Sequence, residues 1–181
     1  MPSDSAQRDG ESRALDISRQ LVEKLTLKKE MLAGAESCTA GLVSDYIARI
    51  PGASAVLWGS FVTYTANAKY TMLGVPEDLV EKHGAVSQRV ALAMAEGALK
   101  KSGAMWAFSV TGLAGPGSDD CGADVGTVWI GISKRDENDR DSFCSDTKKF
   151  LFSGTRNEVR RTAAIQVLEE LLKKVLTEVD F

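Results

Sequence analysis

Residues 35–41 place a hydroxyl group at the centre of a run of small residues. Ser37 follows a short apolar stretch, and an amphipathic stretch begins directly after residue 41. At the junction of a strand and a helix, a serine hydroxyl projects from the end of the sheet. The free N–H groups of the first helical turn then point at whatever it attacks, which is the geometry of a nucleophile with an anion hole. Taken alone, the segment favours a simpler interpretation, in which Ser37 or Thr39 caps the helix.

A serine nucleophile needs a base, and here a lysine suits that role better than a histidine. His83 is the only histidine, and its position at the end of a predicted short helix indicates a surface residue or a helix C-cap. A lysine buried near apolar groups loses its charge more readily and can then accept the serine proton. Lys69, just beyond a predicted strand in an apolar neighbourhood, is the best candidate. An exposed helix lysine remains the commoner fate of this residue type.

A glycine-rich loop at residues 111–118 follows another predicted strand. Its glycines allow backbone N–H groups to approach an anion closely. The loop is not a Walker motif, because no Gly-Lys-Ser/Thr follows. An ordinary turn explains such a loop equally well.

Three arginines occupy the first two turns of the predicted C-terminal helix: Arg156, Arg160 and Arg161. Cations at this end oppose the helix dipole. Their presence indicates an anionic ligand such as a phosphate. The alternative is a pairing with a surface carboxylate, for which Glu158 is available.

Other reactive groups carry less weight. Cys38 adjoins Ser37 and is an alternative nucleophile, but small buried cysteines are common in cores. Asp119, Asp120 and Asp124 raise the question of a divalent metal, yet they have the pattern of solvated loop charges. These aspartates therefore give no reason to expect a divalent metal.

The composition predicts one globular domain of the cytoplasm. The chain has 181 residues, a formal net charge of −3 and a pI near 5.3, which give no reason to expect nucleic acid as a partner. No apolar run approaches the roughly 18–20 residues that cross a bilayer. Three widely spaced cysteines argue against a disulfide framework and fit a reducing cytosol. Residues 1–12 are expected to be a flexible leader, and residues 13–181 the domain.

Hydrophobic periodicity alternates between helical and extended stretches along the chain. We expect strands at residues 31–35, 56–65, 106–111, 126–133 and 142–152. Helices are expected at residues 13–28, 42–50, 66–73, 76–84 and 87–102, and from residue 153 to the C-terminus.

This alternation predicts an α/β protein, a three-layer α/β/α sandwich with a mixed sheet of about five to six strands. Residues 126–152 are two strands joined by a polar turn, which is a hairpin. Ligands of such sheets lie at the carboxyl ends of the strands. The loops after residues 35, 65 and 111 are therefore expected to meet at one edge.

With these residues in view, the chain resembles the C-terminal domain of the competence/damage-inducible CinA family. The resemblance runs from about residue 13 to the C-terminus, and several motifs occur in the same order. The matching segments are residues 35–41, residues 59–64 with Asn67 and Lys69, residues 83–87, 111–116 and 125–129, and residues 152–154 with Arg156, Val159 and Arg160. Ala40 and Asp124 depart from the family pattern, which usually has glycine and proline there.

The family is described as Ser/Lys hydrolases, and its stand-alone members are nicotinamide mononucleotide (NMN) amidohydrolases. The resemblance implies Ser37 as nucleophile, Lys69 as base and Tyr64 as a third catalytic residue. It implies substrate-binding roles for eight further residues: Glu36, Thr39, Asn67, Thr111, Gly112, Gly115, Arg156 and Arg160.

The implied reaction is hydrolysis of the NMN carboxamide to nicotinate mononucleotide and ammonia through an acyl-enzyme. The implied mechanism requires neither a metal nor an organic cofactor. The implied partner is this small nucleotide, with no nucleic acid and no membrane, and a homo-oligomer is expected. The large N-terminal domain of full-length family members has no counterpart in the resemblance, so its activity should be missing. The alternative function is a non-catalytic partner-binding domain associated with competence or DNA repair.

Overall fold

The protein is built on a five-stranded mixed sheet with the strand order β2-β1-β3-β4-β5. The structure, a computed structural model, describes residues 4–117 and 122–177. The strands are β1 Leu32–Glu36, β2 Leu57–Val62, β3 Trp106–Gly112, β4 Thr127–Arg135 and β5 Phe143–Leu151. Strand β1 pairs in parallel with β2 and β3, whereas β4 is antiparallel to β3 and β5. The predicted mixed sheet and its terminal hairpin are confirmed.

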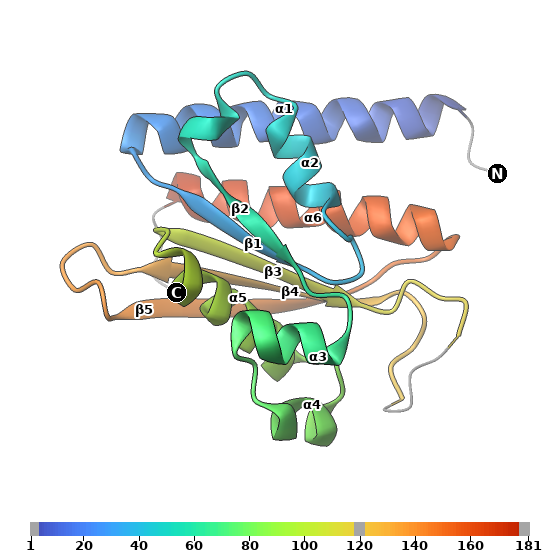
Figure 1. Cartoon of the computed structure of the whole chain (residues 1–181). Coiled ribbons are helices and arrows are strands. Elements are labelled where there is room, and N and C mark those ends of the chain that lie inside the picture. The colour runs from blue at the N-terminus through green and yellow to red at the C-terminus, as the bar shows by residue number, and fades with distance from the viewer. Residues whose placement is uncertain (1–3, 118–121, 178–181) are drawn as a thin grey trace.

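Helices cover both faces of the sheet (Figure 1). One layer holds α1 Asp4–Lys28, α2 Leu42–Ala48 and α6 Arg156–Thr177. The opposite layer holds α3 Ala66–Ala68, α4 Glu77–His83 and α5 Gln88–Ser102. Two short turns complete the list: the 3₁₀ turn η1 Ala53–Ala55 and the π-helical turn η2 Lys69–Leu73. The three-layer α/β/α sandwich expected from the sequence is confirmed.

The long C-terminal helix α6 shows why the helices could be predicted from the spacing of their apolar residues. Its apolar residues recur at helical spacing and all are buried against β3 and β4: Val159, Ala163, Val167, Leu171 and Val175. Helix α5 begins at the expected place, because the Ser87 hydroxyl accepts a hydrogen bond from the Val90 N–H at 3.4 Å. Burying one face of each helix against the sheet gives the core on both sides.

The N-terminal segment differs from its expected form. Helix α1 begins at Asp4, within the stretch that we predicted as a flexible leader. This stretch has contacts that a leader lacks: Glu11 pairs with Arg49 at the C-terminal end of α2, and a Cβ on Gly10 would lie 3.5 Å from Ile165 of α6. The polar composition of this stretch predicted a flexible segment, but the residues form a solvent-exposed helix that packs against α2 and α6. Residues 1–3 lie outside the described part.

The segment after β2 is less regular than a single helix. One turn of α3 leads directly into the π-helical turn η2, which begins at Lys69. Such turns interrupt the ordinary hydrogen-bond ladder and re-aim the side chains that they carry. Gly97 of α5 allows η2 to pack closely, because a Cβ there would lie 2.4 Å from the Leu73 carbonyl oxygen. The backbone that carries Lys69 is thus fixed against the core.

The carboxyl ends of the three parallel strands lie at one edge of the sheet, on the right in Figure 1. The loops after β1, β2 and β3 meet there, as predicted. No helix among residues 4–117 and 122–177 has the length and apolar character needed to cross a membrane.

Candidate active site

Ser37 and Lys69 are brought together at this edge. Lys69 Nζ lies 3.0 Å from Ser37 Oγ and donates a second hydrogen bond, of 2.7 Å, to the Thr63 carbonyl oxygen. Both side chains are buried, with 7% of Ser37 and 1% of Lys69 exposed. The Thr63 carbonyl oxygen, which has no recognisable signal in the sequence, therefore orients the amine toward the hydroxyl. This pair has the geometry of a nucleophile and its base.

Burial gives the Lys69 amine the properties of a base. It lowers the pKa of Lys69 from 10.5 to about 8, because the charged ammonium is poorly solvated there. A substantial fraction of the amine is neutral near neutral pH and can accept a proton. The interpretation of Lys69 as an exposed helix lysine is therefore wrong.

Glu36 holds the turn that carries Ser37. Its carboxylate is fully buried at the end of β1. Six groups donate hydrogen bonds of 2.7–3.4 Å to it: the hydroxyls of Thr39, Ser44 and Ser60 and the N–H groups of Gly41, Val43 and Ser44. Both oxygens are engaged within the protein, so the predicted substrate-binding roles of Glu36 and Thr39 give way to a structural one.

The Glu36 carboxylate also takes the place of a side-chain N-cap for α2. The N-cap position is Gly41, which makes no side-chain cap, and the Glu36 carboxylate accepts the N–H groups that a cap would take. Neither Ser37 nor Thr39 caps the helix, which leaves the Ser37 hydroxyl for Lys69. The first-turn N–H groups of α2 are occupied in the same way. The anion hole that we expected from them is therefore not formed.

The turn at residues 37–41 has a left-handed backbone at two successive residues. Ala40 has a φ of 53° and Gly41 a φ of 96°. Left-handed geometry costs an alanine roughly 1–2 kcal/mol because its Cβ crowds the backbone. The usual glycine of the family pattern at position 40 thus has a conformational reason, and Ala40 keeps the turn at the cost of strain.

Cys38 does not have the properties of a nucleophile. It is buried in the core, and burial raises the pKa of its thiol to about 12. Thiolate is the reactive form of cysteine, so a thiol with this pKa is unreactive at neutral pH. Cys38 and Cys144 are free thiols, and Cys121 lies outside the described residues.

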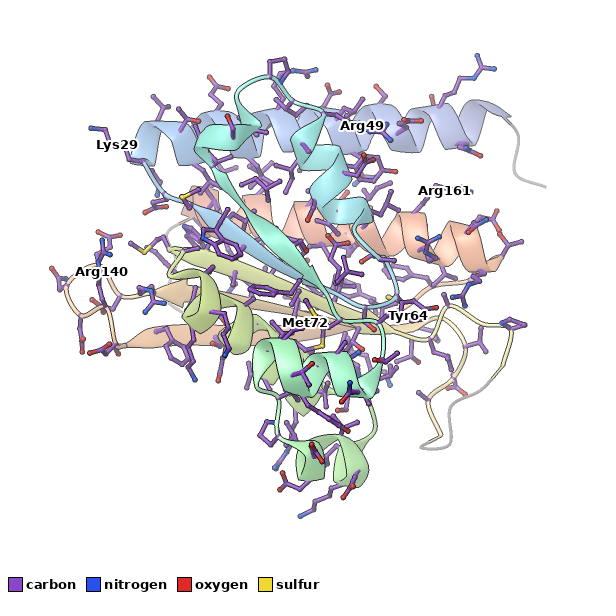
Figure 2. All side chains as sticks on the ribbon, in the orientation of Figure 1. Lys29, Arg49, Tyr64, Met72, Arg140 and Arg161 are labelled. Carbon is purple, nitrogen blue, oxygen red and sulfur yellow. The ribbon has the colours of Figure 1, made fainter. Side chains whose placement is uncertain are left out.

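Arg156 links three segments at the rim of the site. One guanidinium nitrogen donates to the Gly115 carbonyl oxygen at 2.6 Å, and another donates to the Tyr64 hydroxyl. Figure 2 places Tyr64 near the ends of the parallel strands. Its side chain is 53% exposed, and Arg156 is its only hydrogen-bonding side-chain partner in the described chain. Tyr64 thus lies at the rim, without a hydrogen bond to the Ser37–Lys69 pair.

Arg160 has a different position from the one expected of a phosphate ligand. Its Nε donates to the Cys38 carbonyl oxygen and its Nη2 to the Thr39 carbonyl oxygen, both at 2.9 Å. The guanidinium therefore binds the backbone of the turn at residues 37–41. Arg161 faces the other way, toward α1 and α2 (Figure 2), where it lines a cavity of about 120 Å³ with Tyr46 and Glu158.

The residues of the glycine-rich loop contribute mainly to packing, and less to N–H groups that could bind an anion. The buried Thr111 hydroxyl donates to the Ala85 carbonyl oxygen at 2.8 Å, which ties residues 83–87 to β3. A Cβ on Gly112 would lie 2.7 Å from Val128 Cγ2, so glycine is needed there for the close approach of β4. Gly115 presents its carbonyl to Arg156. Asn67 is exposed on α3, two positions before Lys69.

No group of three or more metal-ligating side chains occurs in the described part of the chain. Asp124 is exposed, and its carbonyl oxygen accepts the Thr127 N–H at 3.0 Å. Asp119 and Asp120 lie outside the described residues. The polar arrangement at the sheet edge is a buried lysine amine hydrogen-bonded to a serine hydroxyl.

Comparison with known proteins gives a consistent family. The CinA C-terminal domain profile matches residues 14–175. A putative competence-damage inducible protein of Caldicellulosiruptor bescii is 41% identical over 165 residues, which are 88% of this chain and 38% of that protein. A CinA-like protein of Akkermansia muciniphila is 44% identical over 156 residues, which are 86% of this chain and 36% of that protein. The chain thus spans less than two fifths of the length of these curated relatives.

Solved structures share the fold over nearly their whole length. The competence damage-inducible protein A (ComA) from Klebsiella pneumoniae superposes with a TM-score of 0.84 at 27% identity, covering 91% of this chain and 98% of that chain. The competence/damage inducible protein CihA from Agrobacterium tumefaciens has a TM-score of 0.79 at 35% identity, covering 89% and 94%. By fold, motifs and profile, this chain belongs to the CinA C-terminal domain family.

Proposed function

We propose that the protein hydrolyses the carboxamide of NMN to nicotinate mononucleotide and ammonia, with Ser37 as nucleophile and Lys69 as base. The observation that carries the proposal is the 3.0 Å contact between Lys69 Nζ and Ser37 Oγ, in a setting that lowers the lysine pKa. A buried lysine aimed at a serine hydroxyl has a clear chemical use, whereas for packing alone an apolar side chain is cheaper.

The first half-reaction transfers the acyl group to the protein. Neutral Lys69 takes the Ser37 proton while Oγ forms a bond to the carboxamide carbon, and the carbonyl π electrons move to the oxygen. When the intermediate collapses, the C–N bond breaks and Lys69 returns the proton to the departing nitrogen, which leaves as ammonia. The product is the nicotinoyl ester of Ser37, and Lys69 is neutral again.

The second half-reaction is the same sequence with water. Lys69 takes a proton from water, whose oxygen forms a bond to the ester carbon. The Ser37 Oγ–carbon bond then breaks, and Oγ recovers the proton from Lys69. One amide and one water thus give one carboxylic acid and one ammonia, with no cofactor required.

Charge at the rim supports a phosphorylated substrate. Arg156 is exposed, and in the described chain its hydrogen bonds go to a carbonyl oxygen and a phenol, neither of which neutralises it. A guanidinium in this state suits bidentate binding of a phosphate. The resemblance to stand-alone NMN amidohydrolases supports NMN as the nucleotide, and Arg156 is the residue that we assign to its phosphate.

The test is ammonia release from NMN by the purified protein, with nicotinate mononucleotide identified by chromatography. Ser37→Ala is the matched control, because it removes one buried oxygen and should abolish turnover while the protein stays folded. Equal turnover by Ser37→Ala would exclude the acyl-enzyme route. A well-folded wild-type protein without turnover would instead favour a partner-binding domain.

A further inference from the structure

We propose that Arg160 is a positioning residue: it orients the Cys38–Thr39 peptide so that the Thr39 N–H receives the oxyanion formed when Ser37 attacks. This inference rests on the acyl-transfer chemistry proposed above, but it does not depend on the identity of the substrate. It also gives Arg160 a role other than phosphate binding.

The contact is a two-pronged one between distant parts of the chain. Nε and Nη2 of one planar guanidinium donate 2.9 Å hydrogen bonds to the carbonyl oxygens of Cys38 and Thr39. Some 122 positions separate Arg160 from Cys38, so α6 reaches over the end of the sheet to hold this turn. The rigid fork of an arginine fixes two successive carbonyls in direction, which a lysine cannot do.

Because peptide groups are planar, the hydrogen bonds from Arg160 to these two carbonyl oxygens also set the direction of the N–H groups in the same peptides. In a trans peptide the C=O and the following N–H point to opposite sides, and the Cys38–Thr39 bond is trans. With the Cys38 carbonyl drawn to Arg160, the Thr39 N–H points away from Arg160. The next peptide shows where that side lies: the Thr39 carbonyl is also held, and the opposite Ala40 N–H donates to the Ser37 carbonyl oxygen at 3.1 Å. The side away from Arg160 is therefore the side on which the Ser37 carbonyl oxygen lies.

The other backbone N–H groups of this turn already have partners. The Ser37 N–H donates to the Val110 carbonyl oxygen at 2.9 Å, and the Ala40 N–H is bonded to Ser37. The N–H groups of Gly41, Val43 and Ser44 donate to Glu36.

Within the part of the chain that the structure describes, the Thr39 N–H donates to no backbone carbonyl and no carboxylate, whereas the Cys38 N–H interacts with its own thiol. Buried N–H groups are nearly always paired, so a free one beside Ser37 indicates a place for an anion.

The experiment uses a probe that carries no nucleotide. A fluorophosphonate forms a bond between its phosphorus and Ser37 Oγ, expels fluoride and leaves the serine proton on Lys69, and its phosphoryl oxygen takes the oxyanion position. The second-order rate of labelling is measured by intact mass, and Ser37→Ala must remain unlabelled. Arg160→Met is compared with Arg161→Met, a change of the neighbouring arginine, which lines the cavity beside Tyr46 instead.

We expect Arg160→Met to slow labelling by about 10²-fold, in the range found when an oxyanion donor is lost. Arg160→Lys should be intermediate, and Arg161→Met should match the wild type. The pH midpoint of labelling should stay unchanged in Arg160→Met, because Lys69 and Thr63 are untouched. A general loss of structure would move that midpoint, so the two effects are separable.

NMN turnover supplies the second readout. A positioning role lowers kcat in Arg160→Met and leaves KM within about threefold, whereas a phosphate-binding role raises KM and leaves fluorophosphonate labelling unchanged. Labelling of Arg160→Met at the wild-type rate overturns the inference. A wild-type protein that ignores NMN, but whose labelling depends on Arg160, removes the proposed substrate and leaves the positioning role standing.

Discussion

Lys69 Nζ lies 3.0 Å from Ser37 Oγ although 32 positions separate the two residues in the chain. Strands β1 and β2 are neighbours and run in parallel, so the segments that follow them leave the sheet at the same edge. Ser37 directly follows β1, and Lys69 begins the π-helical turn after β2. The Thr63 carbonyl then holds the amine in place, which makes the pair a property of the topology and not of one local motif.

The pH dependence of turnover should follow Lys69. Only the neutral amine accepts a proton, and the pKa of Lys69 is about 8. We therefore expect kcat/KM to rise with pH through a single ionisation near pH 8 and to level off above it. Lys69→Arg should be nearly inactive at every pH, because a guanidinium is not deprotonated in proteins. A Lys69→Arg variant with near wild-type turnover would make the lysine a fixed charge and not a base.

Glu36 should act through stability. In Glu36→Gln an NH₂ group replaces one oxygen and faces N–H and O–H donors, so buried donors lose their acceptor at about 1–3 kcal/mol each. We expect the free energy of unfolding in urea to fall by roughly 2–4 kcal/mol. Ser60→Ala is the control, because it removes only the longest of these bonds, at 3.4 Å. A Glu36→Gln variant of unchanged stability and raised KM for NMN would return Glu36 to the substrate site.

The elements were predictable because their signals are local. The apolar stripe from Val159 to Val175, the Ser87 cap and the polar turn between β4 and β5 depend on nearby residues, and each was found by periodicity or capping. Ser37 and Lys69 could be chosen from the sequence as suitable residue types in suitable places. Their pairing required the parallel register of β1 and β2, which no single segment encodes.

The supporting contacts were not predictable, because they join residues far apart in the chain. Arg160 had the sequence features of an anion ligand, yet its partners are backbone carbonyls more than 120 positions away. Glu36 looked like a site residue beside Ser37, and only the folded turn shows six donors around its carboxylate. One signal was available: a lone acidic residue at the end of an apolar strand requires buried donors nearby.

Ala40 should tolerate glycine with a gain in stability. Its φ of 53° is unfavourable for alanine and ordinary for glycine, while the greater freedom of glycine in the unfolded chain offsets part of the gain. We expect Ala40→Gly to raise the free energy of unfolding by about 0.5–1 kcal/mol, measured in urea, with turnover kept. Lys29→Gly is a matched control with a φ of 56° at the opposite end of the sheet. A less stable Ala40→Gly would show that the alanine methyl group contributes packing that outweighs its strain.

Arg156 should distinguish substrates with and without phosphate. Arg156→Met removes the rim cation, and a lost charge-assisted contact lowers binding by about 10–10²-fold. We expect kcat/KM for NMN to fall by that factor and kcat/KM for nicotinamide riboside to change little. Tyr64→Phe, which removes one partner of Arg156 but no charge, should have a smaller effect on NMN. Equal losses for both substrates would mean that Arg156 serves only to hold Gly115 and Tyr64 together.

The buried Lys69 amine should also lower the free energy of unfolding, by an amount that depends on pH. A fall of its pKa from 10.5 to about 8 on folding corresponds to roughly 3 kcal/mol of destabilisation below pH 8. Between pH 8 and 10.5 the folded state binds fewer protons than the unfolded state, so this cost declines as the pH rises.

Lys69→Met, which keeps a long apolar side chain and loses the hydrogen bond to Thr63, should therefore be more stable than the wild type by about 1–3 kcal/mol at pH 7. Near pH 10.5 that advantage should be largely gone. Urea unfolding at both pH values measures the difference, and subtraction of the wild type cancels the groups that both proteins share. Lys101→Met, a change of an exposed lysine on α5, should show no pH-dependent difference. A Lys69→Met advantage that stays constant with pH, or is absent at pH 7, would mean that the amine is not strained by burial and is ill-suited to be the base.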